Sequence, residues 1–136
     1  MWQDRVKGIF FTEIRDDKII ETTKISDIKK IDIFEEPLRL ASTLKITSDK
    51  YGNAYALWAQ NTGRDYQLFF KARINGKWMD EIVINRGSGY IKLPDIKVDN
   101  MGTIHISYTK SINPNEPRRT IGVGKYGCFY LKLERG

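Results

Sequence analysis

Side chains that could perform chemistry are scarce in this sequence, which contains one cysteine, Cys128, and one histidine, His105. A thiol–imidazole nucleophile requires these two side chains to meet in space, and nothing in the sequence brings them together. A lone cysteine also excludes an intrachain disulfide and a cysteine-based metal cluster. Because aromatic residues follow Cys128 directly in a strand-like segment, we expect a buried structural thiol rather than a nucleophile.

Two polar loops, residues 61–65 and 113–119, are the candidate ligand-binding segments. Each follows a predicted strand at an equivalent place, so in an array of repeated sheets both loops would lie on one face. Their arginines are of the kind that holds a carboxylate through two parallel hydrogen bonds. Ordinary turn chemistry is the alternative explanation. The candidate ligand-binding residues are Arg64, Asp65, Asn115, Arg118 and Arg119.

Metal and cofactor motifs are incomplete. Asp49, Asp95 and Asp99 could supply oxygen ligands to Ca²⁺, but their spacing matches no complete calcium-binding loop. The Gly-x-Gly runs at 87–89 and 122–124 do not open a helix, so they are not phosphate-binding loops. We therefore expect no metal, no cofactor and no catalytic residue.

The charge balance is basic, with 23 Lys plus Arg against 17 Asp plus Glu and a formal net charge of +6. Such a charge attracts phosphates and acidic polymers. Acidic residues accompany most basic ones, as in residues 15–18, and this favours a mixed solvated surface. Nucleic-acid binding remains an alternative that depends on the net charge and on the pair Arg118–Arg119.

The length of 136 residues suits one domain, residues 1–136, with 40% hydrophobic and 12% aromatic residues to form a core. The mixture of aromatic residues and isoleucine favours strands. The N-terminal residues lack the apolar segment of a secretory signal, and no apolar run reaches membrane-spanning length. We expect a soluble, cytoplasmic protein.

Alternating apolar residues and turn sequences predict the elements that must position these groups. Segments 5–14 and 18–25 flank the turn sequence Arg15-Asp16-Asp17 and predict a hairpin. A connection with apolar anchors, residues 26–42, follows, either irregular or with a short helical turn. The next predicted strands cover residues 43–47, 54–59, 66–73 and 78–84.

The pattern then recurs with an offset of 50 residues, residues 93–108 repeating residues 44–58. At the turn of each copy an Asp can hydrogen-bond the backbone, and a Gly can adopt positive φ. Segments 9–15 and 68–73 form a second echo, and segment 122–133 is a third copy of that aromatic strand. The matching pairs are Ile46 and Ile96, Asp49 and Asp99, Gly52 and Gly102, and Trp58 and Tyr108.

Four short antiparallel strands in about 50 residues are typical of propeller blades. With the strands of a blade labelled A to D, the chain reads C-D, A-B-C-D and A-B-C. The predicted architecture is therefore all-β, a partial β-propeller of antiparallel four-stranded repeats. It has a partial blade at 1–25, the connection at 26–42, a complete blade at 43–85 and a partial blade at 91–136.

Residues 49–58 and 75–78 resemble the blades of sialidase-like β-propellers, which carry Asp-box repeats. There an Asp-x-x-Gly-Asn turn leads into a strand ending in Trp, and a later Gly-x-Trp closes a hairpin. The full box is degenerate here, since Ala72 and Asn75 stand near its Ser and Asp positions and Lys77 precedes its Trp. The resemblance implies a structural role for these motifs. The repeat residues are Asp49, Gly52, Trp58, Gly76, Trp78, Asp99, Gly102 and Tyr108.

The resemblance does not carry sialidase activity to this chain. Such a site requires three arginines on separate blades, a Tyr–Glu pair and an acidic general acid, which converge only in a closed propeller. The exposed aromatic platforms that could stack on sugars are alternatively core residues between blades. The aromatic residues concerned are Trp58, Phe69, Phe70, Trp78 and Tyr108.

About two blades cannot close a ring, so we expect a homo-oligomer in which unfinished sheets of neighbouring copies pair. The alternatives are an open, curved pair of sheets capped by residues 26–40, and a fragment or degenerate form of a longer propeller. The function expected first is a non-catalytic binding or scaffold module for a carbohydrate or a protein. The alternatives are a glycan-acting, sialidase-like enzyme whose site is assembled between chains, and a nucleic-acid-binding protein.

Overall fold

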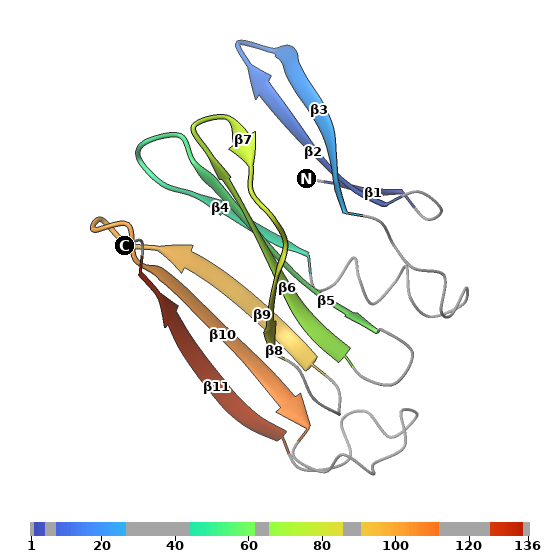
Figure 1. Ribbon diagram of the computed structural model, residues 1–136, viewed down its shortest axis with the longest axis vertical. Coiled ribbons are helices and arrows are strands. Elements are labelled where there is room, and N and C mark those ends of the chain that lie inside the picture. Colours follow the sequence, from blue (N-terminus) through green and yellow to red (C-terminus); the bar gives the residue numbers. More distant parts are fainter. Residues whose placement is uncertain are drawn as a thin grey trace.

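A computed structural model describes residues 2–4, 8–26, 44–61, 66–85, 91–111 and 126–134. Within these ranges all regular structure is β-strand, arranged in three antiparallel sheets that follow one another along the chain (Figure 1). The all-β prediction is thereby confirmed. The described part of the chain has no helix that could span a membrane.

The first sheet has the order β1-β2-β3, with β1 at Trp2–Asp4, β2 at Gly8–Arg15 and β3 at Lys18–Ser26. The predicted hairpin is confirmed as β2–β3. Its two turn residues, Asp16 and Asp17, have φ of 50° and 62°. Positive φ at both central residues is characteristic of the two-residue hairpin turn whose twist matches the twist of the flanking strands. Strand β1, which pairs with the beginning of β2, is an addition to the prediction.

The second sheet has the order β4-β5-β6-β7, and β8 also pairs with β6. The predicted single strand 78–84 is wrong. The Met79 N–H donates to the Ala72 oxygen at 2.8 Å, whereas Phe70 pairs with Ile82, so an extra residue interrupts the strand. The bounds are β4 Lys45–Ser48, β5 Ala54–Asn61, β6 Tyr66–Ile74, β7 Lys77–Trp78 and β8 Ile82–Asn85.

The third sheet has the order β11-β10-β9. Strand β9 spans Ile91–Val98, β10 spans Ile104–Ser111 and β11 spans Tyr126–Leu133. All three strands match predicted strands, although residues 122–125 of the last one lie outside the described residues. This sheet contains the second copy of the 50-residue repeat.

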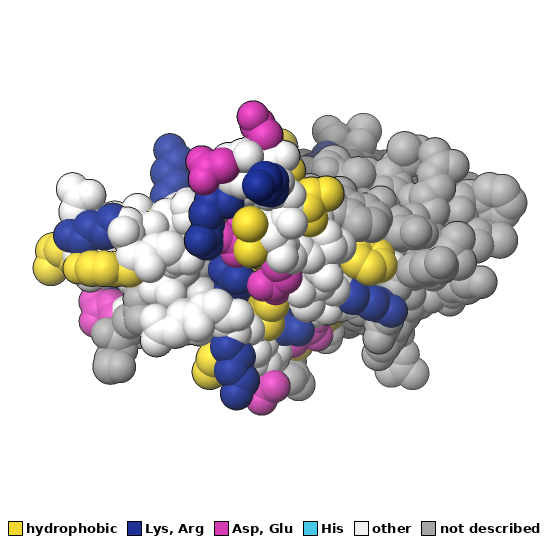
Figure 2. Space-filling view, turned by 90° about the horizontal axis from the view of Figure 1, so that it is seen from above, with side chains coloured by type: hydrophobic (Ala, Val, Ile, Leu, Met, Phe, Trp, Pro, Cys, Tyr) yellow, Lys and Arg dark blue, Asp and Glu magenta, His cyan; other side chains and the backbone are white. Residues whose placement is uncertain are grey.

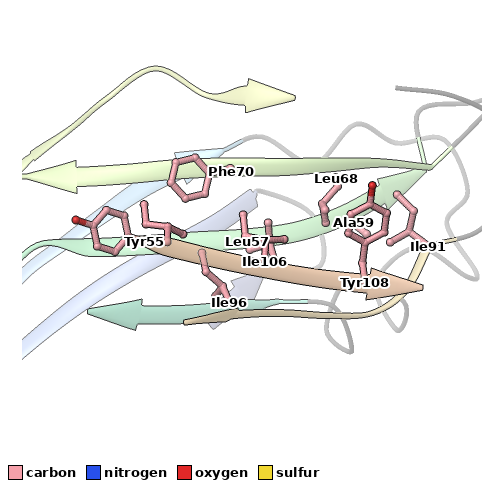
Figure 3. Packing of buried hydrophobic residues seen from close by; sticks show 10 residues of the cluster. Tyr55, Leu57, Ala59, Leu68, Phe70, Ile91, Ile96, Ile106 and Tyr108 are labelled. Carbon is pink, nitrogen blue, oxygen red and sulfur yellow. The ribbon is translucent and has the colours of Figure 1, made fainter. Parts of the chain in front are cut away.

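Strand β5 is buried on both faces and holds the three sheets together. A strand covered on both sides has a continuous apolar sequence rather than an alternating one, as the segment Ala54–Ala59 does. One set of its side chains packs toward the third sheet (Figure 3), and the other set packs toward the first. The first set is Tyr55, Leu57 and Ala59, and the second is Ala54, Ala56 and Trp58.

Corresponding strand positions face the neighbouring sheet in both pairs of stacked sheets. On β10, Ile104, Ile106 and Tyr108 stand 50 residues after Ala54, Ala56 and Trp58 of β5, and they face the preceding sheet as those do. On β2, Ile9 and Phe11 pack toward the following sheet, as Leu68 and Phe70 of β6 do. The second sheet therefore presents one face to the first sheet and the other face to the third.

The two repeated turns have the same backbone hydrogen bonds, as the sequence predicts. One carboxylate oxygen of Asp49 accepts the Tyr51 and Asn53 N–H groups at 2.9 and 3.0 Å. The corresponding oxygen of Asp99 accepts the N–H groups two and four residues ahead at the same distances. The glycines have positive φ, 84° at Gly52 and 82° at Gly102.

Candidate functional site

The ligand-binding residues predicted from the sequence, Arg64, Asp65, Asn115, Arg118 and Arg119, lie outside the described residues. The aromatic residues that could have been sugar platforms are described. Trp58, Phe70 and Tyr108 are buried in the core, which is the alternative that the sequence left open for them. Trp58 stacks on Phe69 with ring centroids 5.8 Å apart, and Trp78 contacts the Phe11 ring edge-on at 5.2 Å.

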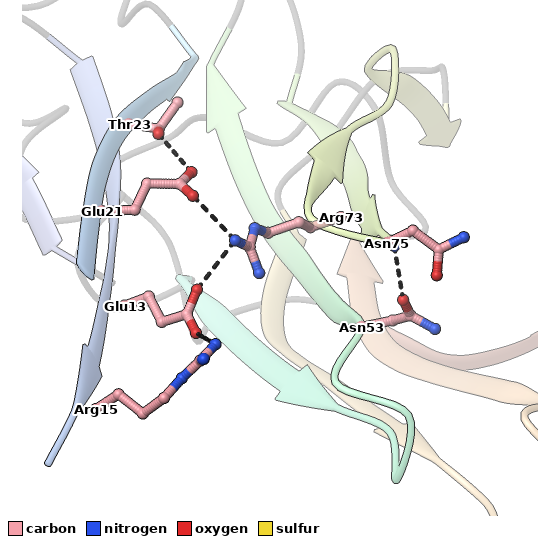
Figure 4. Close-up of polar contacts among 7 residues, drawn as sticks. All are labelled: Glu13, Arg15, Glu21, Thr23, Asn53, Arg73 and Asn75. Carbon is pink, nitrogen blue, oxygen red and sulfur yellow. Dashed lines mark hydrogen bonds and ion pairs between the residues drawn. The ribbon is translucent and has the colours of Figure 1, made fainter.

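The cleft between the first and second sheets is one candidate site, with a volume of about 360 Å³. Arg73 of β6 reaches across it and donates to Glu13 at 3.0 Å and Glu21 at 2.9 Å, which both belong to the first sheet (Figure 4). The Arg73 guanidinium also lies 5.2 Å from the centre of the Phe11 ring. Arg73 thus ties two sheets together through charge and packing.

The carboxylates in this cleft are held in the charged form. The hydrogen bond from Arg15, with the charge of Arg73 behind it, lowers the pKa of Glu13. The hydrogen bond from Thr23, and then that from Arg73, lower the pKa of Glu21. Two carboxylates neutralise the Arg73 charge, so this arginine is not free to hold an acidic substrate. The cleft is best explained as a structural joint between sheets.

The outer face of the third sheet is the second candidate. We define it by Asp95, Lys97, His105, Ser107, Thr109, Cys128, Tyr130 and Lys132, which alternate along β9, β10 and β11. The cross-strand register places these side chains in rows, for instance Asp95, Ser107 and Tyr130. A cavity of about 150 Å³ on this face has Ile96 and Ile106 among its lining residues.

A chain of hydrogen bonds crosses the outer face. The His105 Nε2 lies 2.8 Å from a carboxylate oxygen of Asp99, and the His105 Nδ1 lies 2.6 Å from the Tyr130 hydroxyl. With neutral histidine, Nε2–H donates to Asp99 and Nδ1 accepts the Tyr130 O–H. The hydrogen bond from His105, followed by the one from the Thr103 N–H, lowers the pKa of Asp99.

Cys128 is exposed on this face, so the expected buried thiol is wrong. The physical reason is that Cys128 pairs with Thr109 on the side of β11 over which no described sheet packs. His105 pairs with Lys132, four residues along the strand from Cys128. At about 3.3 Å per residue, roughly 13 Å separates the two rows, so the thiol and the imidazole do not meet.

The Asp99–His105–Tyr130 chain of hydrogen bonds was not predicted from the sequence. Asp99 and His105 are six residues apart across a predicted turn, so their proximity could have been inferred from the hairpin register. Tyr130 joins this chain of hydrogen bonds only through the pairing of β10 with β11, which no local sequence pattern predicts.

No protein-family model, curated protein or solved structure matches this chain.

Proposed function

We propose that the chain is a non-catalytic binding module of the β-propeller type, in which the three sheets are successive blades. The supporting observations are the repeated Asp turns, the second sheet, in which β7 and β8 both pair with β6 as an interrupted fourth strand, and the common order of faces in the stack. The second sheet is then a complete A-B-C-D blade, the third an A-B-C blade and the first a B-C-D blade.

The observation that carries a binding function is the polar outer face of the third sheet. If this outermost face bound no ligand, side chains that are merely solvated would be sufficient there. This face instead combines an exposed tyrosine, a cavity and an ordered hydrogen-bond chain. Polar groups that converge on one cavity are characteristic of ligand sites.

Several copies are proposed to join through sheet edges. Strands β3 and β11 are the outermost strands of the first and third sheets. An edge strand is a template for pairing with another chain. Pairing β11 of one copy with β3 of the next would continue the unfinished A-B-C sheet, with β3 in the place of its D strand and the rest of the first sheet of the next copy beyond it. This arrangement extends the sheets sideways and leaves the outer face accessible.

Three experiments test this function. The full chain is incubated with a glycan array and, separately, with a fluorogenic sialoside, and we expect saturable glycan binding without release of the fluorophore. Turnover of the sialoside would instead favour the glycan-acting enzyme. Light scattering over a range of concentrations is expected to give a multiple of the chain mass, and the mass of a single chain would overturn the assembly.

Nucleic-acid binding is the remaining alternative. On the described part of the face in Figure 2, Lys and Arg side chains are interspersed with Asp and Glu side chains. Such a distribution differs from the basic stripe that follows a phosphate backbone. A silent glycan array together with salt-sensitive retention of the chain on DNA would establish this alternative instead.

A further inference from the structure

The outer face of the third sheet departs from the repeat at the positions that form the core elsewhere. The strand registers equate His105, Ser107 and Thr109 with Tyr55, Leu57 and Ala59, and Cys128, Tyr130 and Lys132 with Leu68, Phe70 and Ala72. In the second sheet these positions pack against the third sheet. Polar groups have replaced apolar ones at sites where the backbone is otherwise alike.

Tyr130 is the centre of this face. Its side chain is 62% exposed, and its hydroxyl is held by His105, which Asp99 holds in turn. The tyrosine and histidine rings are inclined by 25° with centroids 5.9 Å apart. An aromatic ring that is exposed yet held in one orientation is a suitable platform for the C–H face of a ligand, because little conformational entropy remains to be lost on binding.

Hydrogen-bonding groups of both kinds surround the platform. The exposed Asp95 carboxylate accepts, the Lys97 ammonium donates, and the Ser107 hydroxyl does both. One Asp95 oxygen already accepts the Ile96 N–H at 2.9 Å, which holds the carboxylate beside the cavity. The ligand that suits such a set carries several groups that each donate and accept, as sugar hydroxyls do.

The charges of the face select against an anionic ligand. Asp95 and Asp99 carry two negative charges beside the positive charges of Lys97 and Lys132. The Lys132 ammonium is paired with Glu134 at 2.8 Å, which further reduces its attraction for a phosphate or a carboxylate. A neutral ligand therefore fits this face better than a sialylated or phosphorylated one.

We propose that the outer face of the third sheet binds neutral carbohydrate, with one sugar ring stacked on Tyr130 and its hydroxyls bonded to Asp95, Lys97 and Ser107. The cavity of about 150 Å³ suits a single ring rather than a buried chain of sugars. This assignment rests on the proposed binding function and names its ligand class and its residues.

Saturation-transfer NMR on the full chain tests the proposal. The probes are the methyl glycosides of glucose, galactose and mannose, with sialyllactose and glucose 6-phosphate as anionic comparisons. We expect transfer to the ring protons of at least one neutral glycoside and a weaker response from sialyllactose. A response confined to the anionic probes, or from none of the probes, would overturn the neutral-sugar assignment.

Three tyrosine variants provide the residue-level test. Tyr130→Ala is expected to weaken binding of the responding glycoside at least tenfold, as loss of a stacking platform does. Tyr51→Ala is the matched control, because Tyr51 is 72% exposed on a turn of the second sheet. Tyr130→Phe, which keeps the ring and loses the bond to His105, is expected to weaken binding by about two- to threefold.

The outcomes separate this inference from the proposed function. Equal binding by wild type and Tyr130→Ala would overturn the outer-face site while leaving a glycan-binding module in place. Equal losses in Tyr130→Ala and Tyr51→Ala would do the same. Hydrolysis of any glycoside probe would overturn the non-catalytic function itself. Unchanged circular dichroism of all three variants is the check that each remains folded.

Discussion

Two equivalent sheet faces in this molecule differ in burial. On the second sheet, Tyr55, Leu57 and Phe70 are buried against the third sheet, and on the third sheet the corresponding His105, Ser107 and Tyr130 form the outer face. The strand pairing and the turns that precede both faces are alike. The repeat therefore specifies the backbone through its turns, while the side chains of each face decide whether it packs or stays open to a ligand.

The largest expected effect on stability comes from placing a residue of the outer face of the third sheet at the equivalent buried position of the second sheet. Leu57→Ser places the residue of position 107 at a fully buried site in the core shown in Figure 3. We expect about 3 to 5 kcal/mol of destabilisation, because a cavity is created and a hydroxyl is buried without a partner. Urea unfolding measures it, and a loss below about 1 kcal/mol would contradict the assigned core.

The reverse change, Ser107→Leu, is the matched control. Ser107 is exposed beside a cavity that is open to solvent, so the added apolar side chain stays in contact with water and the free energy of unfolding should change by no more than about 0.5 kcal/mol. An increase in stability of the single chain well beyond that value would mean that this face is packed rather than open. Self-association of the variant, seen by light scattering, is compatible with an apolar patch on an open face.

Equal turns should respond equally to the loss of their glycines. Gly52 and Gly102 have φ near 80°, and a Cβ at either position would meet no atom within 4 Å. Gly52→Ala and Gly102→Ala should each cost about 1 to 2 kcal/mol, from backbone strain alone. Thermal unfolding of both variants compares them, and a difference above about 1 kcal/mol would show that the turns are not equivalent.

The sequence predicts these turns well because their chemistry is local. An Asp that accepts the N–H groups of the next residues, with a Gly at positive φ, leaves a clear pattern at positions 49–53 and 99–103. The alternation of apolar residues likewise predicts the strands and the all-β class. The 50-residue repeat follows from both patterns together.

The remaining features depend on partners that are distant in sequence. Strand β1 has three residues, too few for a periodic pattern, and exists through its pairing with β2. The interruption of the predicted strand 78–84 arises from its pairing with β6. Exposure of Cys128 depends on which face of the third sheet lies outside. No nearby residues reveal these choices, so sequence patterns alone miss them.

Acid should remove the stability that the Asp carboxylates of both turns contribute. Burial alone would raise the pKa of Asp49, but hydrogen bonds from Asn53, Tyr55 and the backbone outweigh it and lower the pKa from 3.8 to about 2. A lowered pKa stabilises the fold above the ordinary value of about 4, and this contribution is lost as the pH falls toward 2. Asp49→Asn should flatten this part of the pH profile of urea midpoints.

Asp99→Asn is the comparison, since the His105 hydrogen bond is the largest cause that lowers the pKa of Asp99. The same sign applies, so stability from Asp99 is present above the ordinary pKa of 3.8 and is lost on acidification below it. An Asp49→Asn variant whose stability falls as steeply as wild type between pH 4 and pH 2 would contradict the role of Asp49.

The smallest effect concerns two tyrosine hydroxyls that end the hydrogen bonds of the two Asp turns. The buried Tyr55 donates to Asp49 at 2.8 Å, and the exposed Tyr130 reaches Asp99 only through His105. Tyr55→Phe should therefore cost about 1 kcal/mol, because a part-buried hydrogen bond to a carboxylate is lost. Tyr130→Phe should cost less than about 0.5 kcal/mol, because water can take the place of the exposed hydroxyl as the partner of His105. Paired urea titrations at pH 7 measure both. Equal costs would mean that the His105–Tyr130 pair contributes to stability as a core contact does, and the distinction between a packed face and a ligand face would then fail at its central residue.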